Sequence, residues 1–171
     1  MLISKKINDA INQQIGNEFG ASLQYVAIAV CFDQRALPRL AAHFYKQAAE
    51  ERDHAMRFVK FLVDTDGDVK IPAVAAPRTK FGTAEEAVKL SLDWEIEVTE
   101  QIHKLVALAK KENNYTTDAF LQWFVREQLE EVSAMDNLLK VIRMAGEPGL
   151  LRVEEWLDRQ GGKVAGPETM T

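Results

Sequence analysis

Four long stretches of the sequence repeat apolar side chains every three to four residues, and this periodicity constrains the fold more than any other feature. The stretches cover about residues 4–34, 39–64, 83–111 and 117–145. A repeat of this period places the apolar side chains on one face of an α-helix. No stretch shows the sustained alternation that is typical of a β-strand. The sequence therefore predicts an all-α fold.

The connections between these helices predict how they are arranged. The first and third connections are short, whereas the second has roughly 18 residues and includes the sequence VKIPAVAAPRTKFG. Short loops join antiparallel neighbours, and a long connector can run the length of a bundle and make the second and third helices parallel. We expect a four-helix bundle with one long crossover. Gly67 is expected to end the second helix, and Thr83 in "TAEE" to start the third.

The C-terminal part of the sequence adds a short fifth helix and a tail. The segment LLRVEEWLDR, residues 150–159, is amphipathic and too short to be stable alone. Its apolar face therefore needs a partner surface. We predict one domain over residues 1–160, comprising the bundle and the fifth helix, and a flexible tail over residues 161–171.

Composition and charge exclude several classes of function. The chain has 171 residues, 47% hydrophobic and 27% charged, which suits one soluble globular domain. Its net charge of −5 and the absence of a basic patch argue against a nucleic-acid partner. No apolar run is long enough to span a membrane, the N-terminus lacks the apolar core of a signal peptide, and the single Cys31 excludes an intrachain disulfide framework. We expect a cytoplasmic protein.

Polar side chains interrupt each apolar stripe near the middle of its helix. The interruptions are four carboxylates, one imidazole and one amide: Glu18, Glu51, His54, Glu95, Gln128 and Glu131. Helices of similar length that pack side by side bring their middles to one level, so these side chains should converge in the core. Glu51 and His54 can act together because residues three apart share a helix face.

A buried cluster of four carboxylates requires positive charge. A buried carboxylate is costly unless it is paired or bound to metal, and no lysine or arginine falls on the four stripes. Two divalent ions would supply four positive charges. Oxygen-rich ligands with one imidazole suit iron or manganese better than structural zinc. The alternative, a metal-free structural bundle, leaves the carboxylates without neutralisation.

In these motifs the sequence resembles the ferritin family, in its prokaryotic, haem-free branch, along almost its whole length. The matching segments are GNEFGASLQY, EERDH, DWEIEVTEQI and FLQWFVREQLEE, one from each long helix. The resemblance implies a ferritin-like four-helix bundle with a long crossover and a short fifth helix. It also implies a shell of 24 subunits that oxidises Fe(II) with dioxygen or peroxide and stores the iron as a ferric mineral.

The resemblance also implies roles for the polar cluster, with two irons per subunit. Glu18, Glu51 and His54 match the ligands of the first iron. Glu51 would bridge to a second iron, held also by Glu95 and Glu131.

Further residues match positions around this centre. Gln128 matches a glutamine on the dioxygen side of the centre. Tyr25 and Trp123 match aromatic residues beside the centre. Tyr25 could form a hydrogen bond there or take part in electron transfer. For both residues the alternative role is packing in the core. The resemblance further implies a third, adjacent iron site with four carboxylates: Glu50, Glu127, Glu130 and Glu131.

Two departures separate this sequence from bacterioferritins. Those proteins carry a second Glu-x-x-His motif in the fourth helix. In this sequence the equivalent run starts at Glu127, and Glu130 stands at the position of the histidine. They also place a haem-ligating methionine between the Glu and the His of the second helix, where this sequence has Arg52. We therefore expect no haem.

One rival function remains open for a di-iron cluster in a helical bundle. A monomeric or dimeric di-iron oxidase could act on an organic substrate, with an apolar channel and an electron-donor partner. The short fifth helix, which is typical of shell-forming proteins, favours storage over this alternative.

Overall fold

The computed structural model describes residues 2–161, and these residues form helices and no strand. The elements are α1 (Lys5–Gln34), α2 (Pro38–Asp64), α3 (Ala84–Lys111), α4 (Tyr115–Ala145), the one-turn 3-10 helix η1 (Glu147–Gly149) and α5 (Leu150–Gly161). The predicted all-α bundle with a long crossover and a short fifth helix is confirmed. Residues 162–171, most of the predicted tail, lie outside the described residues.

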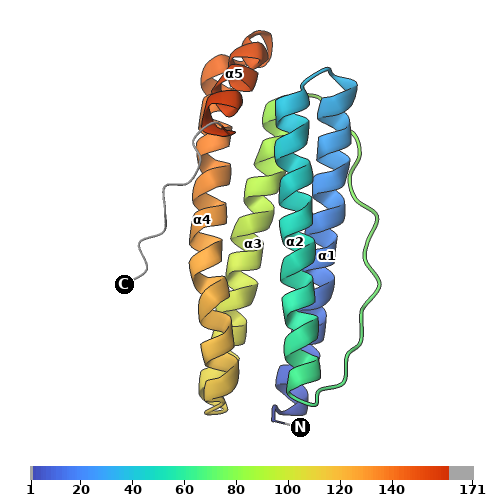
Figure 1. Cartoon of the computed structure of the whole chain (residues 1–171), viewed down its shortest axis with the longest axis vertical. Helices are drawn as coiled ribbons and strands as arrows, with labels where there is room; N and C mark the ends of the chain where they lie inside the picture. The colour runs from blue at the N-terminus through green and yellow to red at the C-terminus, as the bar shows by residue number, and fades with distance from the viewer. Residues whose placement is uncertain (1, 162–171) are drawn as a thin grey trace.

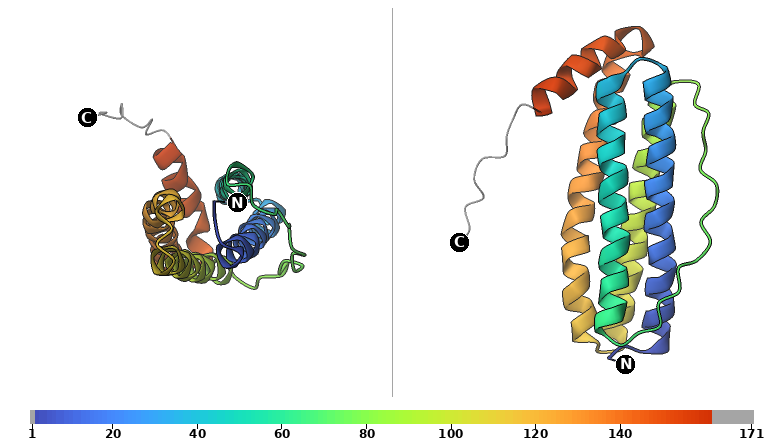
Figure 2. Two further views of the ribbon diagram at one scale, coloured as in Figure 1. Left: turned by 90° about the horizontal axis from the view of Figure 1, so that it is seen from below. Right: turned by 45° about the vertical axis from the view of Figure 1, so that its right-hand side comes forward.

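The four long helices form two antiparallel pairs. α1 packs along α2, α3 packs along α4, and α1 also contacts α3 (Figure 1). The crossover runs along the outside of α1 from one end of the bundle to the other, so α2 and α3 are parallel, as the length of the connector predicts (Figure 1). Viewed from the end, the four helices surround a common axis, and α5 lies across one end of the bundle (Figure 2).

Side-chain amides on α1 hold the start of the crossover. Asn12 donates through Nδ2 to the carbonyl oxygen of Asp68 (2.7 Å), and its Oδ1 accepts from the backbone N–H of Lys70 (2.6 Å). Asn8 donates to the Asp68 carbonyl (3.1 Å) and accepts from the Asp68 N–H (2.9 Å). An amide side chain carries a donor and an acceptor, as a peptide group does. These residues therefore pair with a backbone that has no strand or helix partner.

The later part of the crossover is held in the same way. Gln24 donates to the carbonyl of Arg78 (2.8 Å) and accepts from its N–H (2.9 Å). Between these anchors Gly16 lies under Pro72, and a Cβ atom at residue 16 would overlap the proline ring. The missing side chain lets the connector lie directly on α1.

The starts of α3 and α4 follow from their capping residues. Thr83 accepts from the Glu86 N–H (3.1 Å) and starts α3 at the predicted position. Asn114 accepts from the Thr117 N–H (2.9 Å) and starts α4 at Tyr115, two residues before the prediction. Asparagine is a strong N-cap residue, which explains the earlier start.

α2 ends at Asp64, as predicted, and Gly67 takes part in its cap. The residue in the left-handed conformation is Asp66 (φ 56°), not Gly67. The N–H of Gly67 instead donates to the carbonyl of Leu62 (2.7 Å), as in a Schellman motif. Gly67 is required for another reason, because a Cβ there would come within 2.6 Å of Oδ1 of Asn8.

The apolar core is divided into two clusters by a polar layer. The cluster toward α5 includes Phe32 and Phe44, and the other includes Phe58 and Phe124, whose rings stack at 4.2 Å. Along α1 the change from one cluster to the other occurs around Glu18. The bundle therefore places its buried carboxylates between two apolar halves.

α5 completes the end of the bundle. Val153 is fully buried in the cluster that contains Phe44, and the Glu154 carboxylate accepts from the N–H groups of Arg39 (2.7 Å) and Leu40 (2.9 Å) at the start of α2. Negative charge at a helix N-terminus is stabilising. Across residues 2–161, no helix combines the length and the apolar content that crossing a lipid bilayer requires.

Candidate metal centre

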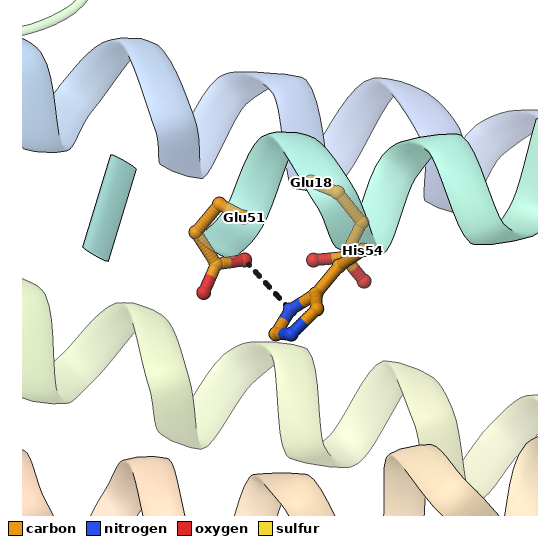
Figure 3. Close-up of side chains that lie close together, drawn as sticks. All are labelled: Glu18, Glu51 and His54. Carbon is orange, nitrogen blue, oxygen red and sulfur yellow. Dashed lines mark ion pairs between the residues drawn. The ribbon is translucent and has the colours of Figure 1, made fainter. Parts of the chain in front are cut away.

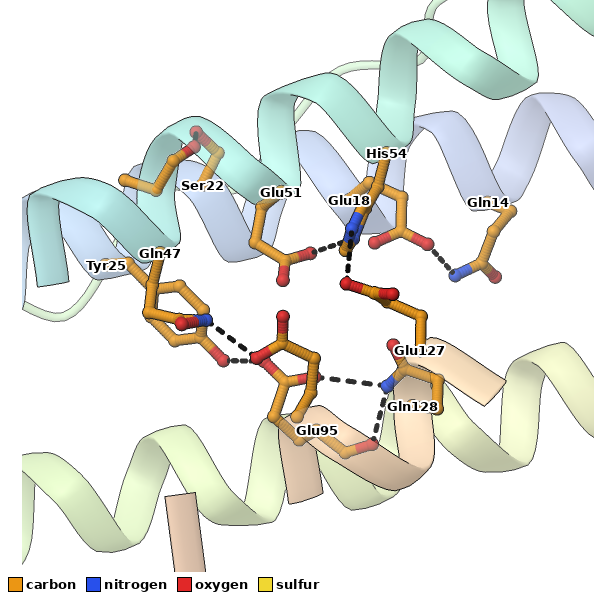
Figure 4. A network of polar contacts seen from close by, with 12 residues as sticks. Gln14, Glu18, Ser22, Tyr25, Gln47, Glu51, His54, Glu95, Glu127 and Gln128 are labelled. Carbon is orange, nitrogen blue, oxygen red and sulfur yellow. Dashed lines mark hydrogen bonds and ion pairs between the residues drawn. The ribbon is translucent and has the colours of Figure 1, made fainter. Parts of the chain in front are cut away.

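The five predicted ligands converge in the middle of the bundle, and each is 7% exposed or less. α1 supplies Glu18, α2 supplies Glu51 and His54, and α3 supplies Glu95 (Figure 4). α4 supplies Glu131. Each lies on the buried stripe of its helix, near the middle of its length. Four separate segments of the sequence therefore contribute to one site.

Glu18, Glu51 and His54 form a set that could hold one ion. One ligand atom from each lies within 4.8 Å of the others, and all three side chains are buried (Figure 3). Nδ1 of His54 lies 3.5 Å from Oε2 of Glu51. Three buried atoms here have no hydrogen-bond partner within residues 2–161: Oε2 of Glu18, Oε1 of Glu51 and Nδ1 of His54. Buried polar atoms are normally paired, so these three fit a ligand set for a metal ion.

Glu95 and Glu131 lie beside this set and have more hydrogen bonds. Glu95 accepts from the Tyr25 hydroxyl at Oε1 and from the Gln128 amide at Oε2 (3.1 Å). Glu131 accepts at Oε2 from Gln47 (2.7 Å). Glu131 could therefore bind a metal through its other oxygen.

The structure brings together part of the predicted third site. Atoms of His54, Glu127 and Glu131 lie within 4.8 Å of one another, with Nε2 of His54 3.9 Å from Oε1 of Glu127. Glu50 is half-buried and forms an ion pair with Lys46 (3.1 Å). Glu130 is exposed and does not belong to this group. The third site remains a prediction.

Burial raises the pKa of each of the four carboxyl groups and so favours the protonated form. Desolvation, with the charge of Glu51 adding to it, raises the pKa of Glu18 well above its ordinary value. Desolvation and the charge of Glu95 do the same for the pKa of Glu51. Burial also raises the pKa of Glu95, against the opposing effect of its hydrogen bonds, and raises the pKa of Glu131 to about 8. Ionising all four requires a compensating positive charge.

No lysine or arginine in the described part of the chain supplies that positive charge, and His54 could supply at most one unit. The lysine and arginine ion pairs within residues 2–161 involve other acids, and none reaches the four buried glutamates. An external cation must therefore neutralise the cluster when it is ionised.

The two aromatic residues take different positions beside the cluster. Tyr25 is fully buried and donates to Glu95 rather than to Glu18, the residue two turns before it on α1. Desolvation and nearby carboxylates raise the pKa of Tyr25 well above its ordinary value, so its hydroxyl remains a donor. Trp123 is half-buried and lies edge to face with His54 at 5.4 Å, with the Arg57 guanidinium 4.0 Å from its ring centre.

Sequence patterns did not reveal two residues that touch the cluster. Gln14 donates to Oε1 of Glu18 (2.9 Å), and Gln47 donates to Glu131. A signal was available, because Gln14 precedes Glu18 by four residues and Gln47 precedes Glu51 by four. Residues at this spacing share a helix face.

Comparisons with known proteins identify the family to which the chain belongs. A family model described as a ferritin-like domain matches residues 8–145. Ferritin BfrB of Mycolicibacterium smegmatis is 44% identical over 158 residues, covering 92% of this chain and 87% of the relative. A bacterial non-heme ferritin of Staphylococcus aureus is 32% identical over 146 residues, covering 85% and 88%.

Solved structures give the same result. An open pore ferritin from the hyperthermophilic archaeon Archaeoglobus fulgidus superposes with a TM-score of 0.88 at 33% identity, covering 91% of this chain and 96% of the other. A humanized archaeal ferritin has a TM-score of 0.88 at 29% identity, covering 96% and 99%. The similarity in structure extends over almost the whole chain.

Proposed function

Because this chain belongs to the ferritin family, we propose that it stores iron and oxidises Fe(II) at the central cluster. Fe(II) is the substrate, dioxygen or peroxide is the electron acceptor, and the oxidised iron is deposited as a mineral inside a shell of 24 subunits. No haem takes part, because Arg52 occupies the place of the haem-ligating methionine.

One observation carries this proposal: a buried cluster of four carboxylates and one imidazole in which, among residues 2–161, polar atoms lack hydrogen-bond partners and no lysine or arginine forms an ion pair with the carboxylates. A structural cluster would be expected to pair its atoms within the protein. A site built for a transient cation leaves ligand atoms free for that cation.

The cluster divides into two iron positions. Glu18 and His54 hold the first Fe(II), Glu95 and Glu131 hold the second, and Glu51 binds both. The four carboxylates release their protons when the two ions bind, so that four negative charges balance four positive charges. Peroxide takes one electron from each iron, and dioxygen takes two electrons from the same pair.

The residues of this chain supply positioning rather than electrons. Tyr25 and Gln128 donate to Glu95 and keep that carboxylate fixed in the water-poor core. We also propose that Glu127, half-buried beside His54, passes oxidised iron out of the core, with Glu50 and Glu130 further along the same route. Gln128 and Tyr25 thus serve the oxidation step, and the outer glutamates serve product release.

The proposed shell agrees with the surface at the α5 end of the chain. Leu151 is 71% exposed and Met144 is 80% exposed, although both are apolar. Contacts between copies would cover such side chains. We further propose that residues 1–160 act as one domain, and that the shell works in the cytoplasm.

Anaerobic titration with Fe(II) followed by exposure to oxygen tests this function, with particle mass measured in parallel. We expect two tightly bound Fe(II) per subunit, rapid oxidation, and a particle of 24 subunits that retains far more iron than two per subunit. A monomer or dimer that binds two irons without accumulating mineral would instead support the di-iron oxidase alternative.

A further inference from the structure

Three of the four buried carboxylates accept a hydrogen bond from a glutamine (Figure 4). The pairs are Gln14 with Glu18 (2.9 Å), Gln47 with Glu131 (2.7 Å) and Gln128 with Glu95 (3.1 Å). Glu51, which we place between the two irons, has no glutamine donor among residues 2–161, and its Oε1 has no hydrogen-bond partner there. The three carboxylates that we assign to a single iron are thus each fixed by a glutamine hydrogen bond, whereas the carboxylate that we assign to both irons is not.

The hydrogen bond from Gln14 determines which oxygen of Glu18 is available to bind an ion. Its amide occupies Oε1, and Oε2 remains buried without a hydrogen-bond partner. The hydrogen bond occupies one lone pair of Oε1 and leaves Oε2 with both of its lone pairs, so Oε2 is the oxygen that is more available to an ion. Glu18 is therefore arranged to bind chiefly through Oε2.

The orientation of the Gln14 amide is itself determined by a neighbour. Asn17 donates through Nδ2 to Oε1 of Gln14 (3.3 Å) and also to Oε1 of Gln101 on α3 (2.9 Å). Because Gln14 receives an N–H at its oxygen, its NH2 group is directed at Glu18. A metal-bound carboxylate has only acceptors, so this is the orientation that the bound state requires.

Gln47 performs the corresponding task across the bundle. It is 6% exposed, lies one turn before Glu51 on α2, and reaches Oε2 of Glu131 on α4. Its amide engages Oε2 of Glu131, a residue that also belongs to the group that contains His54 and Glu127. The hydrogen bond adds a polar link between α2 and α4 to the contacts of His54 with Trp123 and Phe124.

We propose that Gln14 and Gln47 are positioning residues, Gln14 for the first iron position and Gln47 for the second. The inference rests on the proposed function of the cluster. Each glutamine fixes the carboxylate rotamer before the ion arrives, so that less ordering is required on binding. Neither residue touches the ion.

The test replaces each glutamine by methionine, which has a similar length and no N–H donor. Gln34→Met is the matched control, because Gln34 is the last residue of α1 and is exposed. Apo proteins are titrated calorimetrically with Zn(II), which does not change its redox state. The relevant binding events are those that Glu51→Ala removes. Thermal unfolding of each apo protein is measured alongside.

We expect Gln14→Met and Gln47→Met each to weaken one of the two Zn(II) binding events by roughly tenfold to a hundredfold, and Gln34→Met to change neither. His54→Ala distinguishes the positions. In that background Gln14→Met should have little further effect, because the first position is already lost, whereas Gln47→Met should still weaken the second.

Several outcomes would overturn the assignment. The assignment would be overturned if the methionine variants bound Zn(II) as tightly as the unmodified protein, or if Gln34→Met lost as much affinity as they do. A lower melting temperature with unchanged affinity would make the glutamines structural. Should a methionine variant fail to fold, the asparagine variant, whose amide is withdrawn by one methylene, takes its place. If the unmodified protein bound no Zn(II) at the cluster, the proposed function would fail first and this inference with it.

Discussion

Asn8, Asn12 and Gln24 are buried to about the same extent as Glu18, Glu51 and Glu131, with exposures of 2–7% and 1–7% respectively. The two sets differ in how completely their polar atoms are hydrogen-bonded. The amides on α1 pair their donors and acceptors with the backbone of the crossover. The carboxylate cluster has unpaired atoms at Glu18 and Glu51.

The difference separates a structural role from a functional one. Paired buried groups stabilise one arrangement of the chain, and unpaired ones are costly unless a partner arrives. The amides of α1 determine the path of the connector. In the cluster, the desolvation of the carboxylates and the repulsion between them are unfavourable, and a bound cation offsets both. Substitutions in the two regions should therefore have opposite consequences.

The largest effect is expected for iron oxidation in Glu51→Gln. Glu51 is the only carboxylate placed between both iron positions, so its loss should slow the rapid oxidation phase more than about a hundredfold, beyond the effect of an outer-shell change. Glu130→Gln is the control, because Glu130 is exposed. Stopped-flow absorbance after mixing with oxygenated buffer measures both. Equal kinetics for the two variants would contradict the assignment.

The next largest effect is expected for stability in Asn12→Leu. The change removes the donor to Asp68 and the acceptor from Lys70, and should lower the free energy of unfolding by about 2–5 kcal/mol. Denaturant unfolding of the apo protein measures it. Gln13→Leu, at the exposed neighbouring position, should change stability by less than about 0.5 kcal/mol. A mild effect at Asn12 would show that solvent can replace the amide.

The third prediction concerns pH. Glu131 has a folded-state pKa of about 8 against an ordinary value of 4.5, so the folded apo protein holds a proton that the unfolded chain releases. This stabilisation is present below about pH 4.5 and is lost as pH rises through about 8, so apo stability should fall by about 2–4 kcal/mol between pH 5 and 8.5. Glu131→Gln should flatten the dependence. A rise in stability over this range would refute the shift.

The fourth prediction compares two glycines on α1. A methyl group at Gly16 overlaps Pro72, so Gly16→Ala should destabilise the protein by about 1–3 kcal/mol. At Gly20 the nearest atoms are those of Trp94 at 3.4 Å and Val74 at 3.7 Å, so Gly20→Ala should be tolerated and gain up to about 1 kcal/mol of helix propensity. Thermal unfolding separates them. Similar melting temperatures would mean that the connector can move away from α1.

The smallest effect is expected for the apo stability of Glu51→Gln. Glutamine keeps the shape and removes a charge that Glu18 and Glu95 oppose, so the apo protein should be unchanged or up to about 1 kcal/mol more stable. Added Zn(II) should raise its melting temperature less than that of the unmodified protein. A marked loss of apo stability would place Glu51 with the structural amides.

Much of the site was predictable because its signal is local to each helix. The interruptions of the apolar stripes identified Glu18, Glu51, His54, Glu95 and Glu131, and the structure places all five together. The third-site carboxylates were less well determined. Glu50, Glu127 and Glu130 are flexible side chains near the surface, and none of the three is fully buried.

The sequence by itself determined the helices, their order and the parallel arrangement of α2 and α3, because periodicity and connector length are properties of neighbouring residues. Only the tertiary structure decided which side chains pair between segments. Gln47 meets Glu131 across 84 residues, Tyr25 donates to Glu95 rather than to Glu18, and Asn12 holds a backbone 56 residues away. Such pairs depend on the axial shift and rotation of one helix against another, which the packing of the whole core sets.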